Sequence, residues 1–132
     1  MNNSQKLEGT KLENFIPVDS VPELQIIDVV VGTGDTVEPD ATITAHYTGA
    51  LVADGTIFQS SKDSGQPATF GLNQVISGWT QGVPGMKVGG TRRLIIPSAL
   101  AYGSARAASN IPPNSDLVFD IELTAIEKPW YQ

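Results

Sequence analysis

The chain has 132 residues, enough for one compact domain and little else. Hydrophobic residues make up 40 % and charged residues 17 %, a balance that is typical of a folded domain and excludes a disordered chain. The 8 basic and 14 acidic residues give a net charge of −6, which disfavours binding to nucleic acid or to an anionic membrane surface.

Residues 1–23 are mostly polar, and Pro17 and Pro22 argue against a helix through the end of this segment. We predict an N-terminal extension over 1–23, flexible or loosely docked, followed by one domain over 24–132. The extension holds a small apolar group that could pad the domain or meet a partner, and padding is the favoured interpretation. This apolar group consists of Leu12, Phe15, Ile16 and Val18. The polar N-terminus and the lack of an apolar run of ~18 residues predict a cytoplasmic protein.

Four segments have the composition or alternation of β-strands. The run Leu24–Val31 is rich in β-branched residues and ends at a turn-forming Gly-Thr-Gly-Asp. Thr42–Thr48 alternates cleanly, which places Tyr47 on the apolar face and His46 on the opposite one. Thr91–Ile96 alternates more weakly. Leu117–Ile126 alternates best and carries Phe119 on its apolar face.

One short helix is predicted between these strands, because Val75, Ile76, Trp79 and Val83 recur at helical spacing. Ser77 is its candidate N-cap residue, and nearby glycine and proline residues keep it short. A single short helix with several antiparallel strands predicts an α+β domain whose sheet wraps around the helix.

Reactive chemistry has few candidates in this sequence. The chain has no cysteine, and its one histidine, His46, cannot form a multi-histidine metal site, so no metal or other cofactor is expected. Most carboxylates lie in turns or on the solvated face of the last strand, which disfavours general acid-base catalysis. His46 faces away from the expected core, which disfavours a Ser-His-Asp triad.

Large rings remain as candidates, and they come from five separate segments: Tyr47, Phe58, Trp79, Tyr102 and Phe119. Periodicity alone favours a packed core over a binding pocket for these rings. Local context favours the pocket, because Tyr102 lies in a loop of small residues and Ile111 begins a stiff Ile-Pro-Pro turn.

Six motifs, in order along the chain, resemble the FK506-binding-protein (FKBP) family of peptidyl-prolyl isomerases, and the string as a whole looks like bacterial single-domain members. The motifs are His46-Tyr47-Thr48-Gly49, Asp54-Gly55-Thr56-Ile57-Phe58-Gln59-Ser60-Ser61, Val75-Ile76-Ser77-Gly78-Trp79, Ala101-Tyr102-Gly103, Ile111-Pro112-Pro113 and Leu117-Val118-Phe119-Asp120. The resemblance runs from about Leu24 to Glu127. It implies an antiparallel five- to six-stranded half-barrel around one short helix, with a pocket between helix and sheet.

The resemblance also implies roles for nine residues. The five rings become catalytic residues, with Trp79 as the pocket floor and Tyr102 at the rim. The implied substrate-binding residues are Gln59, Val75, Ile76 and Ile111. At position 59 this chain has an uncharged amide where the family usually has an aspartate that bonds to the tyrosine hydroxyl and to macrolides.

The activity implied is cofactor-free rotation of X-Pro bonds during protein folding. An apolar pocket would achieve this by favouring the twisted amide, which separates less charge than the planar one. The expected partners are proline-containing peptides and unfolded clients, with macrolides such as FK506 or rapamycin as further ligands and a monomer as the expected state. The alternative is a non-catalytic binding module for proline-containing segments or a partner protein, which Gln59 keeps open.

Overall fold

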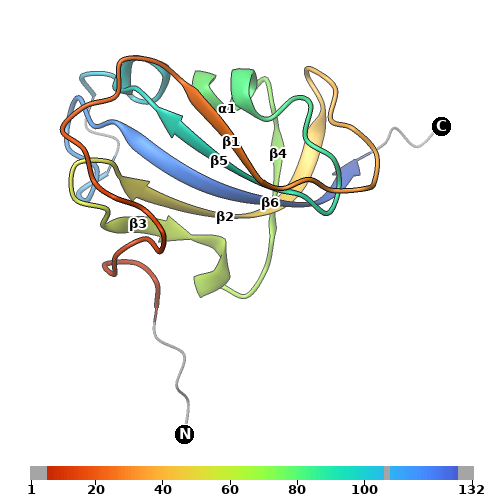
Figure 1. The fold of residues 1–132 in the computed structure, drawn as a ribbon, viewed down its shortest axis with the longest axis horizontal. Coiled ribbons are helices and arrows are strands. Elements are labelled where there is room, and N and C mark those ends of the chain that lie inside the picture. Colours follow the sequence, from red (N-terminus) through yellow and green to blue (C-terminus); the bar gives the residue numbers. More distant parts are fainter. Residues whose placement is uncertain (1–5, 106–107, 128–132) are drawn as a thin grey trace, which may run out of the picture.

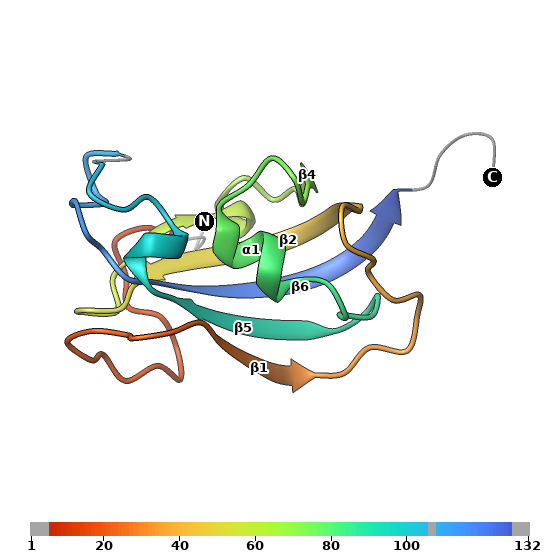
Figure 2. The same ribbon diagram turned by 90° about the horizontal axis from the view of Figure 1, so that it is seen from above.

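The computed structural model describes residues 6–105 and 108–127. Within them, six antiparallel strands form one open sheet that curves around the helix α1 (Ser77–Gly82), as Figures 1 and 2 show. The strands are β1 (Gln25–Val30), β2 (Thr42–Leu51), β3 (Ile57–Ser60), β4 (Ala68–Gly71), β5 (Thr91–Ile96) and β6 (Leu117–Glu127). Short 3-10 helices, η1 (Ser61–Asp63) and η2 (Ser98–Leu100), follow β3 and β5. The predicted α+β class with a six-stranded antiparallel sheet around one short helix is confirmed.

The sheet order is β1-β5-β6-β2-β3, and β4 also pairs with β2. The two shortest strands share one edge of β2, since β3 pairs with its residues 48–50 and β4 with its residues 42–45. The four strands predicted from the sequence are present with nearly the expected bounds, and β5 matches its prediction at both ends. The β1 side chains are all exposed, and the strand lies at one edge of the sheet.

The helix begins one residue earlier than Ser77 as N-cap residue predicts, and Ser77 is not its N-cap residue. Ile76 occupies that position with an extended backbone and no side-chain capping bond, while its carbonyl accepts hydrogen bonds from the N–H groups of Trp79 (3.0 Å) and Thr80 (3.2 Å). Ser77 is therefore the first helical residue. The periodic spacing at Val75 and Ile76 reflects contact with the core rather than helical geometry.

Two glycines let the helix lie close to β5. A Cβ atom at Gly78 would come within 2.6 Å of Ile96, and one at Gly82 would come within 2.7 Å of Leu94. Beyond the helix, the buried guanidinium of Arg92 donates hydrogen bonds to the carbonyls of Gly82 (2.8 Å) and Pro84 (3.2 Å) and pairs with Asp28 of β1. The helix, and with it Trp79, is thus held against the inner face of the sheet.

Residues 6–23 pack on the opposite face of the sheet and against β3 (Figure 1). Ile57 of β3 accepts a hydrogen bond from the N–H of Gly9 and donates one to the carbonyl of Thr10, each 2.8 Å long. Leu12 and Val21 are buried in a second apolar cluster, whereas Ile16 is 84 % exposed. The segment is therefore docked along the sheet by backbone pairing as well as by apolar contacts. No helix of the described ranges is long and apolar enough to cross a membrane.

Candidate active site

A cavity of ≈ 460 Å³ lies between α1 and the inner face of the sheet. The residues that line it come from β2, β3, β4, β6, the approach to α1, α1 itself and the loop after η2. They are Tyr47, Phe58, Gln59, Phe70, Gln74, Val75, Ile76, Trp79, Tyr102 and Phe119. Eight of the nine residues predicted for the site therefore meet around one space. The ninth, Ile111, is packed in the core at 6 % exposure and is not among the lining residues.

Trp79 is surrounded by three rings that meet it edge to face. The ring centroids lie 4.9 Å away for Phe70, 5.3 Å for Phe119 and 5.8 Å for Tyr47. Such contacts are each worth about 0.5–1.5 kcal/mol beyond apolar burial, so the walls of the cavity are rigid. Trp79 is 3 % exposed and belongs to the hydrophobic core, while its indole also lines the cavity. Trp79 is therefore both a core residue and a pocket residue, the two roles that the sequence left as alternatives.

Two lining residues were not predicted from the sequence. Phe70 lies on the four-residue strand β4, opposite the core residue Ile43 of β2, a pairing that only the structure shows. Gln74 directly precedes Val75 and is exposed at the cavity mouth. No periodic pattern marks Gln74, because it lies outside the strands and the helix.

The mouth of the cavity is polar but uncharged. Tyr102 is 41 % exposed, and the amides of Gln59 and Gln74 are also exposed. Burial raises the pKa of the Tyr47 hydroxyl above its usual value, and the nearby Tyr102 raises it further. The Tyr47 hydroxyl is therefore a neutral donor at physiological pH. The indole Nε1 of Trp79 is buried without a hydrogen-bond partner among the described residues.

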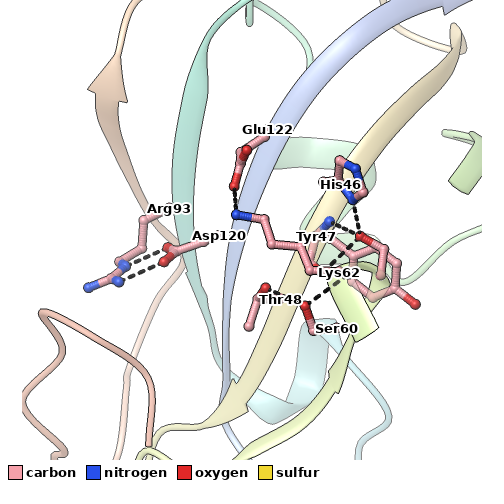
Figure 3. Close-up of polar contacts among 9 residues, drawn as sticks. His46, Tyr47, Thr48, Ser60, Lys62, Arg93, Asp120 and Glu122 are labelled. Atoms are coloured by element: carbon pink, nitrogen blue, oxygen red, sulfur yellow. Dashed lines mark hydrogen bonds and ion pairs between the residues drawn. The ribbon is translucent and has the colours of Figure 1, made fainter. Parts of the chain in front are cut away.

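A polar network on the outer face of the sheet fixes the segment that carries Phe58 and Gln59 (Figure 3). The buried hydroxyls of Thr48 and Ser60 lie 2.8 Å apart and join β2 to β3. The Ser61 hydroxyl accepts a hydrogen bond from the Tyr47 N–H (2.8 Å) and lies 2.9 Å from Nδ1 of His46. Ion pairs of Lys62 with Glu122 and of Arg93 with Asp120 flank these bonds. The short strand β3 is thus held firmly against β2.

The contact between His46 and Ser61 serves the fold rather than a reaction. Ser61 is 7 % exposed, and its hydroxyl is already bound to the Tyr47 backbone, so a substrate cannot reach it. Among the described residues no three side chains of the types that bind metals lie close together. The chemistry of the cavity therefore rests on apolar surface and neutral hydrogen-bond donors.

Comparison with known proteins agrees with this geometry. The model of the family described as FKBP-type peptidyl-prolyl cis-trans isomerase matches residues 34–124. The chain belongs to this family. It is 56 % identical over 101 residues to the FKBP-type isomerase FkpA of Aeromonas hydrophila, covering 75 % of this chain and 36 % of that protein. It is 50 % identical over 91 residues to the peptidyl-prolyl cis-trans isomerase FPR2 of Saccharomyces cerevisiae, covering 67 % of each protein.

A solved FKBP structure has a similar fold. The crystal structure of AtFKBP13 has a TM-score of 0.71 and 40 % sequence identity, covering 82 % of this chain and 96 % of that one. The chain spans about a third of the length of the Aeromonas FKBP, so it corresponds to one part of that larger protein.

Proposed function

We propose that this FKBP domain accelerates the cis–trans isomerisation of X-Pro peptide bonds and so assists protein folding. The single observation that carries the proposal is the cavity of ≈ 460 Å³ with Trp79 in its lining, enclosed by rings that touch one another. A proline ring is small and apolar, and a rigid apolar recess is the environment that binds it well. The family membership supports the same activity.

The reaction needs no nucleophile. Rotation about the X-Pro bond is slow because amide resonance sets a barrier of about 18–20 kcal/mol, and this resonance is lost in the twisted transition state. The twisted amide separates less charge than the planar one, so a site with few water molecules disfavours the planar ground state more. A millionfold acceleration requires about 8 kcal/mol of such differential stabilisation.

The lining residues divide this work between binding and orientation. Trp79, Phe58 and Phe119 supply apolar surface for the proline ring. The hydroxyl of Tyr102, on a side chain that is 41 % exposed, is available to donate a hydrogen bond to the substrate carbonyl. Val75 and Ile76 precede α1 with extended backbone at Ile76, which suits contact with an extended peptide along the cavity edge.

A protease-coupled isomerisation assay on several X-Pro peptides tests the proposal. The chain should accelerate isomerisation in proportion to its concentration, and Tyr102→Phe should lower kcat/KM about fivefold without lowering the unfolding temperature, because this side chain is exposed. Trp79→Phe should lower activity further, although it will also cost stability since Trp79 is a core residue. The indole donates to no described residue, so this replacement breaks no observed hydrogen bond. No acceleration at high protein concentration would leave the chain as a binder alone.

The alternative function is a non-catalytic module that binds proline-containing segments or a partner protein. Gln59 is the observation that favours it, because an amide at the cavity mouth can hold a peptide without the charge that the family aspartate provides. Binding of FK506 or rapamycin in the cavity is also part of the proposal. Isothermal titration of these macrolides into wild-type and Gln59→Asp protein measures their affinity. The cytoplasmic location and the monomeric state remain predictions.

A further inference from the structure

One side chain joins two segments of the cavity that are otherwise far apart along the chain. The side-chain amide of Asn110 donates a hydrogen bond of 2.9 Å to the backbone carbonyl of Phe58 on β3. The same amide nitrogen lies 3.3 Å from a carboxylate oxygen of Glu8 in the N-terminal segment. Asn110 is half-buried, so its bond to Phe58 is partly shielded from water.

Asn110 belongs to the loop that carries Tyr102. The Gly103 carbonyl accepts a 2.7 Å hydrogen bond from the N–H of Asn114, which closes the base of this loop, and the Gly103 N–H donates to Ser98. Ile111, the next residue after Asn110, is anchored in the core. Residues 110–114 therefore connect the bond between Asn110 and Phe58 to Gly103, the neighbour of Tyr102.

The position of the Tyr102 ring depends on its loop more than the positions of the other site rings depend on their own segments. Tyr47, Phe58, Trp79 and Phe119 hold one another through ring contacts with centroids 5.3–6.5 Å apart. Among the described residues none of these ring contacts includes Tyr102, and its side chain is 41 % exposed. The position of its hydroxyl relative to the cavity is therefore set by the loop backbone.

We infer that Asn110 is a positioning residue for isomerisation, which sets Tyr102 opposite Phe58 by tying the Tyr102 loop to β3. This inference rests on the proposed function. Asn110 touches no substrate in this scheme, because it is not among the residues that line the cavity. Its contribution is to the geometry of a hydrogen-bond donor that must meet the substrate carbonyl within a few tenths of an ångström.

The test is a double-mutant cycle of Asn110→Ala and Tyr102→Phe, measured as kcat/KM in the protease-coupled assay well below the unfolding temperature. Asn110→Ala alone should lower kcat/KM about fivefold, the effect of one misplaced hydrogen bond. In the Tyr102→Phe background the same change should cost less than about twofold, since the hydroxyl that it positions is already gone. Asn110→Gln, which keeps the amide donor, should recover most of the activity.

Ser115→Ala is the matched control. The Ser115 hydroxyl donates a 2.7 Å bond to the Pro112 carbonyl, so its loss removes a side-chain bond from the same region without touching β3, and activity should stay within about twofold. If Asn110→Ala does not fold, Asn110→Ser carries the same test with a side chain too short to reach the carbonyl. Full activity of the folded variant, or equal losses in both backgrounds of the cycle, would overturn the inference.

A measurement that does not depend on catalysis separates this inference from the proposed function. The backbone N–H groups of Ala105 and Ile111 are bonded within the loop, to Tyr102 and Ala108. Their hydrogen exchange should accelerate in Asn110→Ala and stay unchanged in Ser115→Ala. If the wild-type chain lacks isomerase activity but exchange is still faster in Asn110→Ala, the proposed function is contradicted and the link between Asn110 and the loop is supported. Unchanged exchange in Asn110→Ala contradicts that link.

Discussion

The ring of Phe58 meets the ring of Phe119 edge to face, with centroids 5.7 Å apart and planes at 86°. The two walls of the cavity approach this closely because Gly49 lies beneath them on β2. A Cβ atom at Gly49 would come within 2.6 Å of Phe58 and 2.7 Å of Phe119. Neither ring can yield easily, since Phe58 and Phe119 are 6 % and 5 % exposed.

Gly49→Ala should therefore push the Phe58 and Phe119 rings apart and change the shape of the cavity. We expect a loss of about 1–3 kcal/mol in the free energy of unfolding from overpacking, and a drop of at least fivefold in kcat/KM as the walls shift. Urea unfolding and the isomerisation assay measure the two effects. The matched control is Gly65→Ala, where an added Cβ meets nothing within 4 Å but the positive φ of 80° costs stability alone. Equal catalytic losses in both variants would contradict the account.

The cavity mouth predicts weak discrimination by charge. Its polar groups are the hydroxyls of Tyr47 and Tyr102 and the amides of Gln59 and Gln74, and no Asp, Glu, Lys or Arg is among the described residues that line the cavity. Peptides with lysine, leucine or glutamate before proline should therefore show little charge-dependent difference in kcat/KM. Gln59→Asp should raise the lysine-to-glutamate ratio about two- to fivefold, as expected for a partly exposed charge pair.

A salt series and a second substitution serve as controls for the effect of Gln59→Asp. The new preference should fade at about 1 M salt, where the screening length falls to about 3 Å. Gln74→Glu places a carboxylate elsewhere on the same mouth. An identical shift in both variants would indicate a general effect of net charge, and no shift in Gln59→Asp would show that the residue before proline lies away from position 59.

Much of the fold could be predicted from local sequence patterns, and the features that these patterns missed have physical causes. The alternation in β2 and β6 correctly placed Tyr47 and Phe119 on the inner face, because one face of each strand is buried. Phe70 was missed because β4 has four residues, too few to show alternation. The docking of residues 6–23 was unpredictable in detail because it depends on pairing between Thr10 and Ile57, which are distant in sequence.

The buried hydroxyl pair on the outer face of β2 makes a third prediction, about stability. Thr48 and Ser60 are 8 % and 6 % exposed, and their hydroxyls lie 2.8 Å apart. Ser60→Ala leaves the Thr48 hydroxyl without this partner, which should cost about 1–3 kcal/mol in the free energy of unfolding. Thr48→Val in that background should cost much less than it does alone, because the unpaired Thr48 hydroxyl is then gone. The Lys62 N–H, which donates to the Ser60 hydroxyl (3.2 Å), loses this acceptor in Ser60→Ala with or without Thr48→Val, so its loss cancels in the comparison. Chemical denaturation of the four proteins measures this coupling, and strictly additive losses would contradict it.

The Tyr47 hydroxyl makes a prediction about alkaline pH. Burial and the neighbouring Tyr102 raise the pKa of this group, so the folded state favours its protonated form. Its contribution to stability is therefore fully present below about pH 10, the usual tyrosine value, and is lost as the pH rises through the higher folded value. The free energy of unfolding of the wild-type chain should fall more steeply above pH 10 than that of Tyr47→Phe. Denaturation at pH 7, 9, 10 and 11 measures the two slopes, and parallel curves for the two proteins would show that ionisation of Tyr47 is not linked to unfolding.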